Sequence, residues 1–130
     1  MLRTLLKAEI TSGAELVISA CGLDRALKNA DLLITGEGCS DEQTACGKLP
    51  AAAGAHAAKY GVPAILCSGA IASGSEVLEK IFDGVFSISN GAIPLEEAIR
   101  KTAENLRRTG ANLAGVVSAF AKDNIQGKSR

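Results

Sequence analysis

The stretch DLLITGEGCSDEQTACGKLP, residues 31–50, decides the fold. It opens with a short apolar run, Asp31–Thr35, which ends at Gly36 and is typical of a strand buried on both faces of a parallel sheet. A loop rich in glycine, carboxylate, amide and hydroxyl groups follows, and Pro50 then marks the start of a helix. Strand, polar loop and helix in this order predict an α/β protein with a ligand site where the strand ends.

The loop between strand and helix carries the groups that hold phosphate in α/β proteins. Its glycines, Gly36, Gly38 and Gly47, allow the backbone to approach a ligand closely and to adopt positive φ. Pro50 at the first helical position leaves free N–H groups facing the loop, where Lys48 adds a full charge. The loop is therefore a candidate phosphate site, although a turn that only caps the next helix fits the spacing equally well.

Neither common nucleotide motif matches this loop. A P-loop would place glycine five residues before Gly47 and Ser or Thr directly after Lys48, but the chain has Glu42 and Leu49 there. A dinucleotide fingerprint would need a third glycine where Asp41 stands. Phosphate chemistry in this loop would therefore use a different arrangement.

Strand and helix patterns alternate along the chain, which predicts a parallel sheet. The fold class is α/β, with three layers (α/β/α) and a small sheet of about three strands between covering helices. Ser12 and Glu15 form a capping box, Ser73 and Glu76 cap a later helix, and Pro94 begins the longest helix, which we expect to cover one face of the sheet. The predicted helices are residues 12–21, 23–29, 49–60, 73–82 and 94–122, and the further predicted strands are residues 63–68 and 84–88. We expect a single domain over residues 1–123, followed by a frayed tail at 124–130.

Composition argues against two classes of partner. Hydrophobic residues make up 47% of the 130 residues, and 14 acidic residues balance 14 basic ones. Such a chain lacks the electrostatic footprint of a protein that binds nucleic acid or an anionic membrane. The sequence displays no signal peptide and no apolar segment of membrane length, so we expect a cytoplasmic protein.

The four cysteines and the single histidine do not follow a metal-site pattern. Cys21 and Cys67 lie in apolar runs, which predicts that they belong to the core. Cys39 and Cys46 lie in the polar loop, where a reactive thiolate is an option. His56 lies on an alanine-rich helical stretch and is expected to be partly exposed rather than a ligand.

The loop also resembles the signature of a known enzyme family. The residues Thr35-Gly-Glu-Gly38, then Asp41-x-Gln43-Thr44 and Gly47-Lys48-x-Pro50, are similar to the signature loop of the bacterial glycerate kinases that phosphorylate D-glycerate from ATP. Similarity extends along nearly the whole chain, from Ser12 to Phe86. The resemblance implies a Rossmann-like half domain that corresponds to the carboxy-terminal third of those longer kinases.

Two departures from the family pattern affect what the resemblance implies. The family usually has an arginine after Thr-Gly-Glu-Gly, and this chain has Cys39, which removes a bidentate anion contact. The amino-terminal strand, the inserted domain and the Asp-Gly-Gly and Gly-Gly-Ser loops of those kinases have no counterpart here. We therefore expect the chain to be inactive alone.

The loop chemistry and the resemblance together give expected roles. Asp41 is the candidate catalytic base or Mg²⁺ ligand, and Lys48 is expected to stabilise phosphoryl oxygens. Mg²⁺ and ATP are the expected cofactors, and a small hydroxy acid is the expected acceptor. The candidate substrate- and phosphate-binding residues lie in the loop or at the end of the neighbouring strand: Thr35, Gly36, Glu37, Gly38, Gln43, Thr44, Gly47, Ser68 and Gly69.

Three functions remain open at this point. The first is a glycerate kinase fragment, and the second is a non-catalytic anion- or nucleotide-binding domain, or a subunit that needs a separate amino-terminal partner. The third is a thiol-based redox or metal module that uses Cys39 and Cys46. Because a thin sheet has unpaired edges, we also expect a homo-oligomer or pairing with the missing amino-terminal portion.

Overall fold

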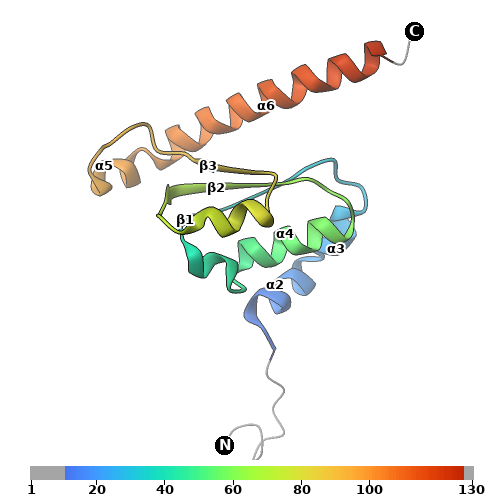
Figure 1. Cartoon of the computed structure of the whole chain (residues 1–130), viewed down its shortest axis with the longest axis horizontal. Helices are drawn as coiled ribbons and strands as arrows, with labels where there is room; N and C mark the ends of the chain where they lie inside the picture. Colours follow the sequence, from blue (N-terminus) through green and yellow to red (C-terminus); the bar gives the residue numbers. More distant parts are fainter. Residues whose placement is uncertain (1–10, 128–130) are drawn as a thin grey trace, which may run out of the picture. The chain divides into compact units, whose positions relative to one another are not determined.

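The computed structural model describes residues 11–127, and side chains through Ala121. The chain divides into two compact units, Met1–Ser87 and Ile88–Arg130 (Figure 1). The first unit contains, in chain order, α2 (Gly13–Cys21), α3 (Leu23–Leu27), β1 (Leu33–Ser40), the 3₁₀ helix η1 (Glu42–Ala45), α4 (Leu49–Lys59), β2 (Ala64–Ile71), the 3₁₀ helix η2 (Ser75–Lys80) and β3 (Gly84–Ser87). The second contains α5 (Leu95–Arg100) and α6 (Thr102–Gly127).

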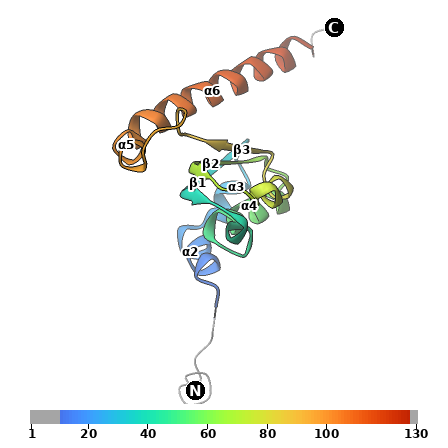
Figure 2. The same ribbon diagram turned by 60° about the vertical axis from the view of Figure 1, so that its left-hand side comes forward.

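The three strands form one parallel sheet in the order β1-β2-β3. Leu33 pairs with Ala64, and Ile65 pairs with Gly84, so the strands advance across the sheet in chain order. Helix α4 connects β1 to β2 and lies against one face of the sheet (Figures 1 and 2). The α/β class with a small, three-stranded parallel sheet is confirmed.

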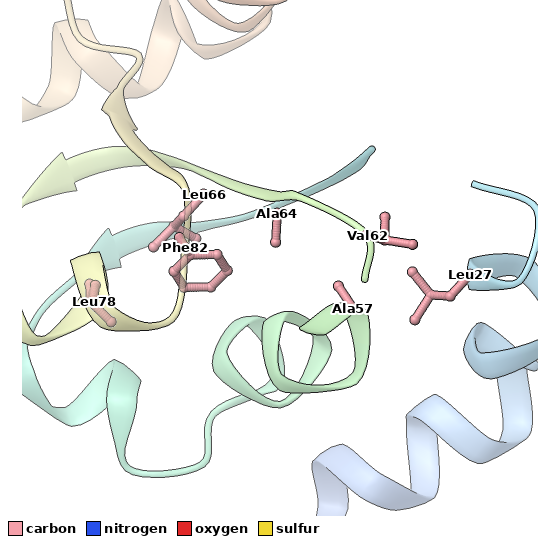
Figure 3. Close-up of a cluster of buried hydrophobic side chains, with 7 residues drawn as sticks. All are labelled: Leu27, Ala57, Val62, Ala64, Leu66, Leu78 and Phe82. Carbon is pink, nitrogen blue, oxygen red and sulfur yellow. The ribbon is translucent and has the colours of Figure 1, made fainter. Parts of the chain in front are cut away.

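Small side chains bring α4 close to the sheet. Ala57 is fully buried, and a Cβ added at Gly54 would come within 2.9 Å of side-chain atoms of Ile81 and Phe82. Seven buried residues form the core of the unit, and Figure 3 shows them in a row that runs from Leu78 of η2 to Leu27 of α3: Leu27, Ala57, Val62, Ala64, Leu66, Leu78 and Phe82. With few aromatic residues available, aliphatic packing at short distance supplies most of the burial.

Strand β1 differs from its prediction in length and in burial. It continues through Gly36 to Ser40, because Gly36 and Glu37 pair with Cys67 and Ser68 of β2. Its residues alternate between half-buried and exposed, and Ile34 is 54% exposed. The prediction of a strand buried on both faces is therefore wrong for β1, which turns alternate residues toward α4.

Two predicted helix starts also differ. Ser12 is the N-cap of α2, as predicted, but its side chain makes no capping hydrogen bond. The predicted helix 73–82 is instead the short 3₁₀ helix η2, which begins after Gly74 in a left-handed conformation (φ 84°). Gly74 is the N-cap of η2 and no side-chain hydrogen bond caps it, so the cap predicted for Ser73 and Glu76 is wrong.

The second unit replaces the predicted helix 94–122 with two helices. Helix α5 ends at Arg100, and its C-cap residue is Lys101 (φ −91°, ψ 4°), whose amino group lies 2.7 Å from Glu97 Oε1. Helix α6 begins at the next residue. Along α6, Leu113 is buried, whereas Leu106 and Phe120 are exposed. Among the helices within residues 11–127, none is both long enough and apolar enough to cross a membrane.

Candidate functional site

The candidate site lies where β1 and β2 reach their carboxyl ends. Glu37 pairs in register with Ser68, and Ser40 pairs with Ile71 at the end of both strands. The chain leaves β1 at Asp41, passes through η1 and enters α4 after Lys48. Parallel strands collect ligand-binding groups at this edge, as the sequence predicts.

Buried hydroxyl groups orient the carboxylate of Glu37. Its Oε1 atom accepts a hydrogen bond from Ser40 Oγ at 2.8 Å and another from Thr44 Oγ1 at 2.7 Å. Ser40 also shares a hydrogen bond with Ser68, and all three hydroxyl residues are fully buried. Because Ser40 donates its one proton to Glu37, Ser68 must be the donor to Ser40. The Glu37 carboxylate is thus held by Ser40 of β1, which Ser68 of β2 supports in turn, and by Thr44 of η1.

Asp41 and Thr44 form a reciprocal capping box at the start of η1. The backbone N–H of Thr44 donates to Asp41 Oδ1 at 3.0 Å, and the N–H of Asp41 donates to Thr44 Oγ1 at 3.1 Å. Thr44 therefore connects both carboxylates, since its hydroxyl also donates to Glu37. This arrangement fixes Asp41 and Glu37 on either side of one buried side chain.

Lys48 completes the cluster with an ion pair to Asp41. Its Nζ lies 3.1 Å from Asp41 Oδ1 and 3.4 Å from Thr44 Oγ1, and both charged side chains are 39% exposed. The hydrogen bond from Lys48 lowers the pKa of Asp41 below its ordinary value, and the bond to Asp41 raises the pKa of Lys48. The site network, as we name this cluster, consists of Glu37, Ser40, Asp41, Thr44, Lys48 and Ser68.

The loop glycines serve two different purposes. Gly47 has φ +92°, a left-handed conformation that glycine adopts without strain, and it turns the chain from η1 into α4. Gly36 and Gly38 lie within β1 and are not among the positive-φ glycines of the described residues, so that part of the prediction is wrong for them. A Cβ at Gly36 would collide with the carbonyl of Cys67, so this glycine permits close strand pairing.

The remaining predicted site residues lie near the network but outside it. Thr35 is a half-buried residue of β1, Gly69 is a residue of β2, and Gln43 is exposed on η1. No hydrogen bond of the described residues joins the side chain of Thr35 or Gln43 to the site network. Their roles in ligand binding stay predictions. The one network member that the sequence did not single out is Ser40.

The structure corrects two expectations about the cysteines and the histidine, those for Cys21 and His56. Cys21 is exposed, not a core residue, whereas Cys67 is buried and its burial raises the pKa of its thiol. Cys39 and Cys46 are exposed, with free thiols, near the site network. His56, expected to be partly exposed, is buried against two carboxylates. Within the described part of the chain, no group of three or more His, Cys, Asp and Glu side chains could hold a metal ion.

Helix α4 begins directly after Lys48 of the site network. Lys48 is its N-cap residue, Leu49 its first helical residue and Pro50 its second, one position later than predicted. No side-chain hydrogen bond caps this terminus. The first N–H groups and the positive end of the helix dipole therefore add to the charge of Lys48, which favours an anion at this position.

Comparison with known proteins identifies relatives of the chain. The sequence profile of the glycerate kinase family matches residues 1–118. A glycerate kinase of Bacillus cereus (strain ATCC 10987 / NRS 248) is 40% identical over 112 residues, which are 85% of this chain and 29% of the relative. A glycerate 2-kinase of Escherichia coli (strain K12) is 34% identical over 118 residues, 90% of this chain and 31% of the relative.

A solved structure has the same fold. The crystal structure of a provisionally assigned glycerate kinase 2 from Salmonella typhimurium LT2 superposes with a TM-score of 0.71 at 34% identity, covering 93% of this chain and 31% of that one. The chain thus spans about 30% of the length of the relatives it matches. With a profile match over most of its length and the same fold in a relative, the chain belongs to the glycerate kinase family.

Proposed function

We propose that the site network forms part of the phosphoryl-transfer site of a glycerate kinase, which moves a phosphoryl group from ATP to D-glycerate. The observation that carries this proposal is the convergence of Lys48, the uncapped start of α4 and two oriented carboxylates at one sheet edge. Phosphoryl transfer depends mainly on positioning and on neutralising charge that spreads over the phosphoryl oxygens. This convergence provides both.

Lys48 and the start of α4 stabilise phosphoryl oxygens in this proposal. The ammonium group approaches an anion as a point charge, and the backbone N–H groups after Lys48 donate hydrogen bonds. Gly47 leaves the approach to these donors open, since it carries no side chain. Five other predicted residues then contribute to positioning the hydroxy acid and the nucleotide: Thr35, Gly36, Gly38, Gln43 and Gly69.

Asp41 suits metal binding better than base catalysis. The hydrogen bond from Lys48 lowers its pKa, so the carboxylate stays charged and accepts a proton weakly. Mg²⁺ in phosphoryl-transfer sites is held by one or two carboxylates together with substrate phosphates, and Asp41 with Glu37 matches that donor set. When bound, Mg²⁺ would neutralise charge on the phosphate groups of ATP. Glu37, held by Ser40 and Thr44, orients the acceptor side of the site.

The isolated chain is proposed to bind an anion or nucleotide without turnover. It spans about 30% of the length of the matched relatives, so a whole glycerate kinase has further residues around its substrates. The partial coverage favours the view that the isolated chain is a non-catalytic binding domain or a subunit that needs a separate partner. A thiol-based module is less well supported, because the exposed Cys39 and Cys46 belong to no metal cluster of the described residues.

A chimera tests the proposed function directly. The chain would replace the matching segment of the Bacillus cereus glycerate kinase, and purified chimera and isolated chain would be assayed for D-glycerate-dependent ATP turnover. We expect turnover by the chimera and none by the chain alone. A folded chimera without turnover would contradict the proposed role of this site, and turnover by the chain alone would contradict its dependence on further residues.

We also propose that the isolated chain associates in solution. The edges of a three-stranded sheet leave backbone donors and acceptors unpaired, and Ile34 and Phe86 are exposed on the strands. Sedimentation at micromolar concentration would then detect a homodimer or a larger species. A clean 13.3 kDa monomer would mean that these surfaces need no partner.

A further inference from the structure

A second polar cluster surrounds His56, the single histidine of the chain. The imidazole lies on α4 with a side chain only 8% exposed. Its Nδ1 is 2.6 Å from Asp24 Oδ1 on α3, and its Nε2 is 3.1 Å from Glu15 Oε2 on α2. The ring therefore joins three helices through two hydrogen bonds.

The geometry determines the charge state of this imidazole. A neutral ring has one N–H group, so one of the two contacts would place a nitrogen lone pair against a carboxylate oxygen. An imidazolium donates from both nitrogens and satisfies Asp24 and Glu15 together. Lys59 Nζ lies 3.4 Å from Nε2, and it would donate to that nitrogen only if the ring were neutral. The two states therefore use different partners for Nε2.

Within the part of the chain that the structure describes, α2 and α3 have one buried residue each, and Leu23 of α3 also packs against the core. Ile18 is the buried residue of α2 and Leu27 that of α3, whereas Leu16 is 64% exposed. Short helices with little apolar burial depend on the contacts that tie them down. The bonds from His56 to Asp24 and Glu15 are two such contacts.

We propose that His56 is a proton-controlled clamp that holds α2 and α3 against α4 and releases them when the imidazolium loses its proton. The clamp is separate from the site network and does not depend on the proposed catalytic function. A cavity of about 280 Å³ beside His56, lined also by Glu15, Asp24 and Arg25, gives protons access to the ring.

The charged neighbours determine the pH range of the clamp. The hydrogen bond to Asp24 raises the pKa of His56 above its ordinary value, with Glu15 acting in the same direction, while burial of the ring and the charge of Lys59 oppose them. Arg25 on α3 lines the same cavity and adds another positive charge. Because the folded pKa is the higher one, the stabilisation is complete below the unfolded pKa of about 6.5 and is lost as pH rises through the folded pKa.

Two measurements on the intact chain test the clamp. NMR titration of the single imidazole gives its pKa, which should exceed 6.5. Amide hydrogen exchange, corrected for the intrinsic effect of pH, should then become at least about tenfold faster in residues 13–27 than in β2 as pH rises through that pKa. A pKa below 6.5, or equal pH responses in both segments, would overturn the proposal.

Variants identify the partners. Asp24→Asn should lower the pKa of His56 and reduce the pH dependence of exchange in residues 13–27, and His56→Gln should abolish that pH dependence. Lys59→Ala is the matched control on the same helix: it should raise the pKa of His56 and keep the pH dependence. If Asp24→Asn left the pKa unchanged, or Lys59→Ala lowered it, the neutral tautomer would be correct and the clamp would be wrong. Asp24→Asn alone tests whether His56 is protonated in the clamp, even if His56→Gln does not fold.

Discussion

The two ends of helix α4 carry polar clusters of opposite character. At its start, Lys48 pairs with Asp41 at 3.1 Å while both side chains stay 39% exposed. About two turns later, His56 lies between Asp24 and Glu15 with 8% of its side chain exposed. An exposed pair stabilises a fold little but stays open to ligands, whereas a buried group needs its partners. One helix thus separates groups suited to binding from groups suited to holding the domain together.

The largest expected effect is on activity, at the start of α4. In the Bacillus cereus chimera, Asp41→Asn should lower kcat/KM by roughly 100-fold or more, because one charged group at a phosphoryl-transfer site is lost. The asparagine still accepts the capping hydrogen bond of η1, so the urea midpoint should hardly change. Glu42→Gln, at the exposed neighbouring carboxylate, is the matched control. Equal kinetics for the two variants would remove Asp41 from the site.

The next largest effect is on stability, at the buried cluster. His56→Ala should lower the free energy of unfolding at pH 6 by about 1–2 kcal/mol, since two charge-assisted hydrogen bonds are lost while half-exposed Asp24 and Glu15 keep partial hydration. Urea unfolding measures the loss. Lys59→Ala, at an exposed residue of the same helix, should change it by less than about 0.5 kcal/mol. Similar losses in both variants would abolish the contrast between the two ends of α4.

A smaller gain is expected beside the site network. Cys39 is exposed at the position where the resemblance implies an arginine, so Cys39→Arg should tighten sulfate or phosphate binding by about 1 kcal/mol, roughly fivefold. Calorimetric titration of the isolated chain measures the change. Cys46→Arg, at the exposed thiol that follows η1, controls for net charge. If both variants bind equally, the gain is non-specific, and if neither binds more tightly, position 39 faces away from the anion.

The smallest effect is expected for Lys48→Met on stability. The ion pair to Asp41 is exposed, so the urea midpoint at pH 7 should be nearly unchanged. The lowered pKa of Asp41 means that its small contribution is present above the unfolded pKa and is lost as pH falls through the folded one. Carbon NMR of the Asp41 carboxyl should show its pKa rising in the variant. An unchanged pKa would mean that Lys48 is not its partner in solution.

The sequence predicts the order of elements and most of the site network, because these depend on local patterns. The sequence predicts the strand from Asp31–Thr35, the turn from the glycines that follow and the helix from Pro50. The polar groups of the loop are close in sequence, so their proximity in the fold is also predictable. The capping box of Asp41 and Thr44 follows a spacing that is visible in the sequence, although the box predicted at Ser12 forms no side-chain bond. Short-range signals are thus informative but not decisive for individual caps.

The parts that the sequence does not predict depend on residues far apart in the chain. Strand β1 continues to Ser40 because β2 pairs with it. The local sequence Gly-Glu-Gly is typical of a loop and does not predict this extension. The hydrogen bond between Ser40 and Ser68 joins residues 28 positions apart, which only the paired strands bring together. His56 is buried against Asp24 and Glu15, which lie 32 and 41 residues earlier in the chain. The pattern of apolar residues along one helix does not predict contacts with residues so far away in the sequence.

The bond between Ser40 and Ser68 has a consequence for the order of folding. Its two hydroxyls are 28 residues apart, and parallel strands pair only after the connecting helix has crossed between them. Asp41 meets Thr44 and Lys48 through local contacts, whereas the bond between Ser40, which holds Glu37, and Ser68 of β2 waits for strand pairing. The complete site therefore forms only when β1 and β2 have paired. An anion that binds only the complete site should slow unfolding and leave the folding rate unchanged.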